Sequence, residues 1–204
     1  TKDPILTYEV VGQESYIGGA GAITGHLEAL GIQVSRDLNA LPPIKKTRGV
    51  LRQPGDTLLK VFSYVEQAHG EITAAVPFSA GLTVVGDFGH GAFIPPLPTK
   101  AEGSFLAVTA QANSMNWGFN RLSKWCGLAD LLVGDEPEWR LAWGDDRTPL
   151  EELLRRAREE WGIPLPVATM GHRGSMLLGK DGLVAIPAIS GKIVDRMGAG
   201  DAFL

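Results

Sequence analysis

Four short apolar runs, followed by loops of small and polar residues, constrain the fold of this chain more than any other feature. Residues 82–85 lead into the loop GDFGHG, and residues 131–133 lead into Gly134-Asp135. Buried parallel strands have this pattern when they deliver loops to a site at one edge of a sheet. The alternation of such strands with helices predicts a single α/β domain over residues 1–204 with a largely parallel sheet. The other two runs are residues 105–109 and 167–169.

Two helices are predicted from their start and stop signals. Residues 148–151, TPLE, have a capping-box pattern with proline at the first helical position, and Gly162 ends the amphipathic stretch that follows. The cluster GGAG at residues 18–21 opens another helix, which ends at Gly31. Residues 5–11, before this cluster, alternate in the manner of a strand.

Two β-hairpins are predicted as additions to the parallel sheet. In the first, residues 47–65 turn around QPGD, where Pro-Gly suits the centre of a tight turn. In the second, residues 175–186 turn around GKDG. Neither hairpin needs a helical crossover, so both can be placed at the margins of the fold.

Composition excludes several classes of partner. The 204 residues have a net charge of −4 and a pI near 5.6, which does not suit binding of nucleic acid or of an anionic membrane. No apolar run approaches the roughly 20 residues of a membrane-spanning helix. A single cysteine fits a reducing compartment, so we expect a cytoplasmic protein. Because the charge balance disfavours nucleic acid and anionic membranes, we expect the partner to be a small molecule. The sequence begins TKDP, without an initiator methionine, so we expect it to start inside a longer chain.

The final residues, MGAGDAFL, carry the clearest chemical signal. Gly198-Ala199-Gly200 before an apolar stretch predicts a helix start, where unpaired backbone N–H groups make an anion site. Glycines allow the backbone to curve around a phosphate, and Asp201 would lie beside it as a general base. This arrangement suits phosphoryl transfer. The alternative is a turn in which Asp201 only caps the helix.

Several segments together resemble the ribokinase-like (PfkB) carbohydrate kinases, and most closely the heptose-phosphate kinase branch, the kinase half of ADP-heptose synthases. The terminal DRMGAGDAF is the most specific of these segments. The resemblance implies a three-layer α/β sandwich with a small β lid, whose strands lie around residues 5–11 and 47–65. The segments are IGGAGAITGHLEALG, VVGDFGHGAF, VGDEPE, VATMGHRGSMLL and VDRMGAGDAFL.

The resemblance implies roles for residues on the sugar side of the site. Asp201 falls at the position of the catalytic base. Gly18 and Gly19 match a glycine pair that borders the sugar. The anion hole for the transferred phosphoryl group matches Gly198, Ala199 and Gly200.

The resemblance also implies ATP and Mg²⁺ as cofactors. Asp135 and Glu138 match an Asn-x-x-Glu motif whose glutamate organises Mg²⁺ through water. Asp135 stands where the family has asparagine, which puts metal affinity and selectivity in question. Thr169, Gly171 and Gly174 match the loop that lies along the nucleotide phosphates.

Further substrate contacts are predicted from basic and amide side chains. Arg48, with Lys45 and Lys46 beside the lid hairpin, could hold the phosphate of a phosphorylated sugar; the alternative is a solvated edge that discourages strand pairing. Asn113 follows the strand at residues 105–109, where loops meet the site, and is otherwise a polar loop residue. His90 could contact the substrate or act as a structural hydrogen-bonding group.

Three departures from the family pattern limit what can be carried over. Ala22 replaces an asparagine that contacts a sugar hydroxyl, so the identity of the substrate is not transferable. The spacing from Gly19 to Thr47 is shorter than in the family, and segments beyond both ends of this chain are missing. The short spacing is either a true deletion or the result of residues that are absent from this sequence. We expect a truncated domain, with chain gaps near residues 31–41 and after residue 204.

The function predicted from the sequence is ATP-dependent phosphorylation of a hydroxyl group on a sugar or sugar phosphate. The partner is then a small molecule, and the lid strands could also pair between subunits in a homodimer. Two alternatives stay open. One is a non-catalytic module that binds a sugar phosphate or nucleotide, and the other is a nucleoside kinase.

Overall fold

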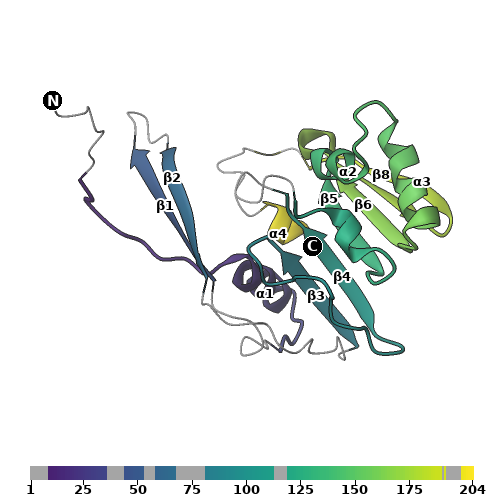
Figure 1. Cartoon of the computed structure of the whole chain (residues 1–204), viewed down its shortest axis with the longest axis horizontal. Helices are drawn as coiled ribbons and strands as arrows, with labels where there is room; N and C mark the ends of the chain where they lie inside the picture. Colours follow the sequence, from purple (N-terminus) through teal and green to yellow (C-terminus); the bar gives the residue numbers. More distant parts are fainter. Residues whose placement is uncertain are drawn as a thin grey trace.

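Two sheets organise the part of the chain that the computed structural model describes, which is residues 9–35, 44–52, 58–67, 81–112, 119–189, 191 and 199–204. One sheet has six strands, the other has two, and helices cover the larger sheet (Figure 1). In chain order the elements are α1 Gly19–Ala29, β1 Ile44–Arg52, β2 Leu58–Gln67, β3 Leu82–Asp87, β4 Phe105–Ala110, η1 Leu122–Trp125, β5 Leu131–Asp135, α2 Glu136–Trp143, α3 Leu150–Glu160, β6 Leu165–Thr169, η2 Gly171–Arg173, β7 Ser175–Gly179, β8 Gly182–Ile186 and α4 Ala199–Phe203.

The six-stranded sheet has the order β3-β4-β5-β6-β7-β8. Strands β3 to β6 run parallel to one another, and the hairpin β7–β8 continues the sheet in antiparallel fashion. Each of the four apolar runs singled out in the sequence forms one of the parallel strands. The predicted α/β fold with a largely parallel central sheet is therefore confirmed.

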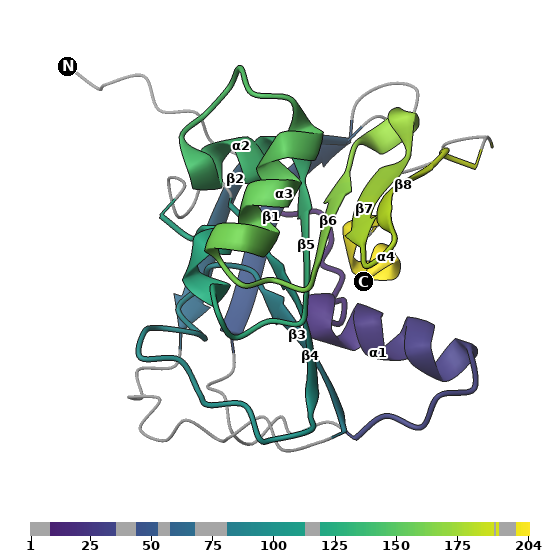
Figure 2. The same cartoon turned by 90° about the vertical axis from the view of Figure 1, so that its right-hand side faces the viewer.

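The sheet lies between two helical layers (Figures 1 and 2). On β3, Val85 belongs to the buried core shared with α2 and α3. The next residue, Gly86, faces the opposite side, where an ideal Cβ would lie 3.3 Å from Cδ1 of Ile23 in α1. Successive residues of a strand point to opposite faces, so α1 covers the face that α2 and α3 leave open. Helix α4 packs against α1 on that face.

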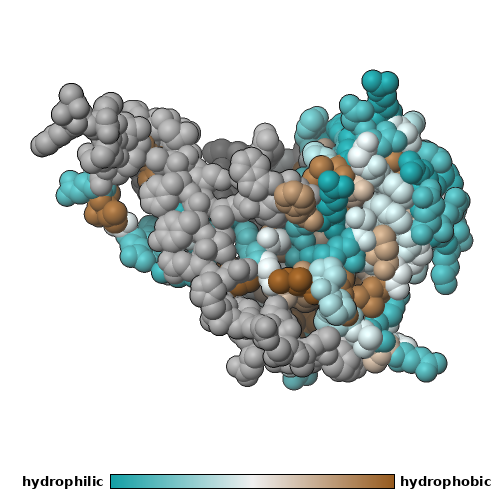
Figure 3. Space-filling model, viewed as in Figure 1, coloured by the Kyte–Doolittle hydropathy of each residue, from teal (hydrophilic) through white to brown (hydrophobic). Residues whose placement is uncertain are grey.

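The main core lies on the α2 and α3 side of the sheet. Parallel strands buried on both faces need continuous apolar runs, which explains the composition of β4 and β5. Trp125 and Trp139 are the largest fully buried side chains, and both indole N–H groups donate hydrogen bonds. Outside this core, the exposed surface of α3 is charged, as the hydrophilic area over it in Figure 3 shows.

The start of α3 differs from the sequence prediction. The helix begins at Leu150, and Pro149 occupies the N-cap position without a side-chain hydrogen bond. The hydroxyl of Thr148 donates to Oδ2 of Asp145 at 2.7 Å instead, and its backbone N–H donates to Oδ1 of the same carboxylate at 2.9 Å. The capping box predicted at residues 148–151 is therefore wrong, because Asp145 binds the threonine that would have capped the helix.

The two-stranded sheet β1–β2, called the lid below, confirms the antiparallel strands of the first predicted hairpin, whose QPGD turn is outside the described part. Its strands pair antiparallel from Ile44 opposite Gln67 to Arg52 opposite Leu58. It stands beyond α1, away from the central sheet (Figure 1). The strand predicted at residues 5–11 is not present at residues 9–11, where Val10 and Val11 are exposed; the rest of that segment, like residues 36–43 of the predicted gap, is outside the described part.

No helix of the described part combines the length and apolar character that crossing a lipid bilayer requires.

Candidate functional site

The carboxyl ends of the parallel strands bring two of the predicted site residues together. Asp135, the last residue of β5, is the register partner of Thr169, the last residue of β6. At the neighbouring strand ends, Asp87 of β3 is the register partner of Ala110 of β4. Ligands of open α/β sheets bind outside the carboxyl ends of the strands. This edge is therefore the candidate site.

Asp135 and Glu138 form a reciprocal capping box at the start of α2. Oδ1 of Asp135 accepts a hydrogen bond from the backbone N–H of Glu138, and Oε2 of Glu138 accepts one from the backbone N–H of Asp135, both at 2.8 Å. Oε1 of Glu138 also accepts from the backbone N–H of Ala112, beyond β4, at 3.2 Å. The predicted acid pair thus fixes the strand-to-helix turn and holds the end of β4 against it.

The electrostatics of this pair favour a cation. The pKa of Glu138 is raised to about 7, mainly by burial; the charge of Asp135 also raises it, while hydrogen bonds from the backbone of Asp135 and Ala112 lower it. Burial also raises the pKa of Asp135, with a further contribution from Glu136. Two desolvated carboxylates of like charge are stabilised in the ionised state by a nearby positive ion.

Asp135 and Glu138 are also the candidate ligands for Mg²⁺. The described residues contain no group of three or more His, Cys, Asp or Glu side chains placed to hold a metal. Mg²⁺ commonly keeps several waters and takes one or two carboxylates together with phosphate oxygens of the substrate. Asp135 and Glu138 fit this kind of site, in which the protein supplies only part of the coordination shell.

The loop between β6 and β7 contains the other residues predicted to contact the nucleotide. Gly171 and Gly174 both have positive φ, at +59° and +87°. Packing also requires glycine at position 174, because an ideal Cβ there would lie 2.0 Å from the carbonyl oxygen of Ile186 in β8. Met170 closes the loop by donating its N–H to the carbonyl of Gly174 at 2.8 Å. The fold requires Gly174 independently of any ligand.

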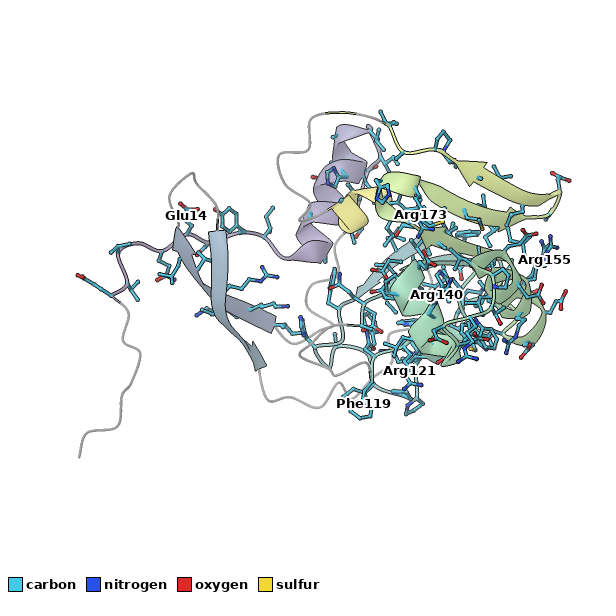
Figure 4. The ribbon with its side chains drawn as sticks, turned by 90° about the horizontal axis from the view of Figure 1, so that it is seen from above. Glu14, Phe119, Arg121, Arg140, Arg155 and Arg173 are labelled. Carbon is cyan, nitrogen blue, oxygen red and sulfur yellow. The ribbon has the colours of Figure 1, made fainter. Side chains whose placement is uncertain are left out.

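Arg173 on this loop forms an ion pair that the sequence analysis missed. Its guanidinium pairs with Oε2 of Glu136, in the first turn of α2, while Arg140 pairs with Oε1 of the same carboxylate at 2.7 Å. Arg140 and Arg173 are labelled in Figure 4. The helical spacing of Glu136 and Arg140 could have predicted one of these pairs. The pair with Arg173 spans 37 residues and has no local signal.

The glycine pair at the start of α1 packs against the loop that follows β3. Gly18 is the N-cap of α1 in an extended conformation, with open space around it. An ideal Cβ on Gly19 would lie 2.1 Å from Cζ of Phe88. Gly86 makes room for the same ring, at 2.8 Å from Cε2. The small residues therefore let the Phe88 ring lie between β3 and the first turn of α1.

The terminal motif forms the predicted helix start. Ala199 and Gly200 are the first residues of α4, which packs against α1. Gly200 is exposed and has open space where a Cβ would lie. The backbone of Asp201 lies in α4; its side chain is outside the described part, as is Gly198.

The lid contributes positive charge next to the loop after β3. Arg48 lies on β1 and is exposed, and Lys46 lies two residues before it. Burial lowers the pKa of His90, and the charges of Lys46 and Arg48 lower it further, against an opposing effect of Asp87. The charged groups of the lid are therefore close enough to His90 to act on its ionisation. Asn113, the other predicted substrate residue, is outside the described part.

A comparison with protein-family models shows to which family this chain belongs. The family model of the pfkB family carbohydrate kinases matches residues 102–204, which is half of the chain. The chain belongs to the PfkB family of carbohydrate kinases. The matched half of this PfkB chain includes Asp135, Glu138, the β6–β7 loop and the terminal motif, whereas the glycine pair and the lid precede it.

Three solved structures that resemble part of this chain carry the names of kinases. Aminoimidazole riboside kinase from Salmonella enterica is 22% identical, with a TM-score of 0.41, over 50% of this chain and 35% of that one. Fructokinase from Vibrio cholerae, solved with fructose, ADP and a calcium ion, is 24% identical, with a TM-score of 0.39, over 50% and 33%. Phosphofructokinase-2 from Escherichia coli, solved with fructose-6-phosphate, is 15% identical, with a TM-score of 0.40, over 50% and 32%.

The PfkB chain thus spans about a third of the length of these solved structures. A search of curated protein sequences found no match.

Proposed function

We propose that this chain belongs to an ATP-dependent kinase that phosphorylates a hydroxyl group of a sugar phosphate, of the heptose-phosphate kind. The observation that carries the proposal is the packing of α4 against α1. It brings the helix of the predicted base, Asp201, beside the helix that begins at the predicted sugar-binding pair Gly18-Gly19. The two helices are separated by most of the chain and lie in contact. The proposed site requires this contact, because the predicted phosphate nest belongs to α4 and the predicted sugar-binding glycines belong to α1.

The residues at the strand ends supply the nucleotide side of this proposal. Thr169 and the N–H groups around Gly171 would contact the phosphates of ATP, and the exposed start of α4 at Gly200 would hold the transferred group. Bound Mg²⁺ neutralises charge on the phosphate oxygens. Asp135 and Glu138 would hold its water shell. Asp201 would accept the proton of the attacking hydroxyl group as the new O–P bond forms.

A phosphorylated acceptor is favoured over a neutral sugar by the charges near the lid. The charges of Lys46 and Arg48 on the lid both lower the pKa of His90, which lies on the loop after β3. A phosphate group bound beside the lysine and arginine side chains of the lid would gain charge-assisted hydrogen bonds and would be stabilised by their charge. A neutral sugar would not provide this stabilisation.

We also propose that two copies pair through the lid. In the described residues the lid sheet consists of β1 and β2 alone. An isolated two-stranded hairpin is marginally stable in water, and pairing with the lid of a second copy would extend the sheet. Light scattering of the purified protein tests this, and a monomer at all concentrations would exclude it.

The proposed activity is tested by a screen of the natural full-length protein. ATP is supplied with heptose phosphates, hexose phosphates, unphosphorylated sugars and nucleosides, and ADP release is measured together with ³¹P NMR of the product. We expect ADP release with sugar phosphates and a new phosphate-ester signal. Transfer only to nucleosides would favour a nucleoside kinase. Binding of sugar phosphate or ATP without transfer would favour a non-catalytic module.

A further inference from the structure

A buried ion pair lies beneath the loop that joins β3 to the rest of the site. Lys124 in η1 pairs with the carboxylate of Asp87, the last residue of β3, and their side chains are only 13% and 1% exposed. Oδ2 of Asp87 also accepts a hydrogen bond from the indole of Trp125 at 3.0 Å. Both side chains are largely buried and bound by groups of the protein itself, so we give neither of them a catalytic role.

Lys124 connects the two ends of this loop, residues 87–93. Its ammonium group bonds the carboxylate of Asp87 at the start and the carbonyl of Phe93 at the end, the latter at 3.1 Å. Within the loop, the N–H of Gly89 donates to Oδ1 of Asp87 at 3.2 Å. The side chain of a single lysine therefore closes the loop into a fixed shape.

Asn120 extends the same network to the end of β4. Its amide donates to the carbonyls of Asp87 and Gln111, both at 3.1 Å, and its carbonyl oxygen accepts from Lys124. Asn120 is buried, and these hydrogen bonds give it a structural role. The ends of β3 and β4 are thus tied at the edge where the site lies.

The loop that Lys124 closes faces both elements of the sugar side. Phe88 packs against Gly19 at the start of α1. His90 responds electrostatically to Lys46 and Arg48 of the lid. A change in the shape of the loop would therefore move the surface between α1 and the lid, while the capping box of Asp135 and Glu138 is held by separate hydrogen bonds.

We propose that Lys124 is a positioning residue for the phosphoryl acceptor: it holds the loop of residues 87–93 in the shape that joins the first turn of α1 to the lid. Burying a charged pair costs desolvation energy, and apolar residues of similar volume are often as stable or more so. A buried pair at this place is therefore better explained by the geometry that it imposes than by stability. The inference rests on the proposed kinase function, but one part of its test, the hydrogen exchange of the loop, does not require that function.

The opposite edge of the same sheet contains a matched control. Lys100 pairs with Asp130 at 2.6 Å, with side chains that are 26% and 19% exposed. Asp130 also accepts from the backbone N–H of Leu106, near the start of β4. This pair has the same residue types, but it is more exposed than Lys124 and Asp87 and lies at the amino ends of the strands. Lys100→Met should therefore affect stability and not acceptor binding.

The experiment compares Lys124→Met with Lys100→Met in the natural full-length protein. Amide hydrogen exchange of residues 88–93 should accelerate about tenfold or more in Lys124→Met and stay unchanged in Lys100→Met. For the acceptor identified by the screen, KM should rise about tenfold in Lys124→Met while the KM for ATP stays within about twofold. Equal changes of both KM values, equal effects of the two variants, or unchanged exchange of the loop would overturn the inference.

A second variant keeps the test decisive if Lys124→Met does not fold. Asn120→Ser removes the amide bonds to the carbonyls of Asp87 and Gln111 and the hydrogen bond that Lys124 donates to Asn120, and it leaves the ion pair of Lys124 with Asp87 in place. It should shift acceptor KM in the same direction by a smaller factor, and an unchanged acceptor KM would again contradict the proposal. If the wild-type protein transfers phosphate to no acceptor, the proposed function is wrong, and the exchange data alone decide whether Lys124 holds the loop.

Discussion

The ring of Phe88 occupies the space that a side chain on Gly19 would need, because an ideal Cβ there would lie 2.1 Å from Cζ of the ring. Gly19→Ala must displace the ring or the first turn of α1. Overpacking of this kind costs about 1–3 kcal/mol, so we expect a lower free energy of unfolding despite the better helix propensity of alanine. Chemical denaturation of the variant measures the difference.

Gly25 provides the control in the same helix. It is exposed, and an ideal Cβ would have no neighbour within 4 Å. Gly25→Ala should stabilise the protein by about 0.5–1 kcal/mol, because alanine loses less conformational entropy in a helix. If both variants shift stability in the same direction, the packing of Phe88 against Gly19 is not what requires the glycine.

Gly174 should be more sensitive to substitution than Gly171, although both lie in the predicted phosphate loop. Each has positive φ, which costs alanine about 1–2 kcal/mol. Only at Gly174 would the new Cβ also collide with backbone, the carbonyl oxygen of Ile186. We expect Gly174→Ala to lower the free energy of unfolding by at least about 2 kcal/mol more than Gly171→Ala. Thermal unfolding of the two variants tests the difference, and equal losses would contradict it.

Most of the central sheet was predictable because its signals are local. The apolar runs, the glycines with positive φ after α1 and α3, and the β7–β8 turn each specify their own element within a few residues. Their order along the chain then constrains the topology, because parallel neighbours need crossover connections. The acidic pair Asp135 and Glu138 was found by resemblance, and its capping role shows why the two residues are spaced by three.

The features that the sequence did not predict depend on residues that are far apart in the chain, or on two hydrogen bonds that compete for the same side chain. Thr148 fits a capping-box pattern as well as Asp135 does, but its hydroxyl is hydrogen-bonded to Asp145 instead. The sequence pattern does not tell which of these two local hydrogen bonds forms. Lys124 and Asp87 are separated by more than thirty residues and meet only when β3 and η1 pack together. Buried networks of this kind carry no periodicity that a sequence could reveal.

Stability should fall with rising pH through the titration of Glu138. Its pKa is about 7 in the folded chain against an ordinary value of 4.5, so between these values the folded state binds more protons than the unfolded state. The stabilising contribution is complete below pH 4.5 and is lost as the pH rises through 7. Asp135, whose pKa is also raised, acts in the same direction.

Glu138→Gln isolates this effect. Glutamine loses one acceptor, which shifts stability by a constant amount, but it does not titrate. In metal-free buffer, the free energy of unfolding of the wild type relative to Glu138→Gln should decrease from pH 5 to pH 8. Urea unfolding at several pH values measures it. A difference between the two proteins that stays constant across this range would mean that Glu138 ionises normally.

Asp201→Asn tests the proposed base. Asparagine keeps the size of the side chain and cannot accept the proton of the attacking hydroxyl, so kcat should fall by about a hundredfold or more, while ATP binding is nearly unchanged. Isothermal titration with ATP and steady-state rates measure the two quantities. Gly200→Ala, in open space on α4, should fold normally and reduce both ATP affinity and rate if the transferred phosphate lies against that backbone. A rate for Asp201→Asn within about threefold of the wild type would remove the aspartate from the mechanism.

The lid charges should distinguish a phosphorylated acceptor from a neutral one. Replacement of Lys45, Lys46 and Arg48 by methionine removes three positive groups from β1, so KM for a sugar phosphate should rise about tenfold more than KM for the unphosphorylated sugar. The control replaces three exposed basic residues elsewhere, Arg147, Arg155 and Lys180, and corrects for net charge. A readout that does not require activity is the pKa of His90, which should rise in the lid variant because Lys46 and Arg48 no longer lower it. If NMR titration shows this rise but both KM values change equally, the charges face the loop without binding the substrate, and the solvated-edge interpretation of β1 holds.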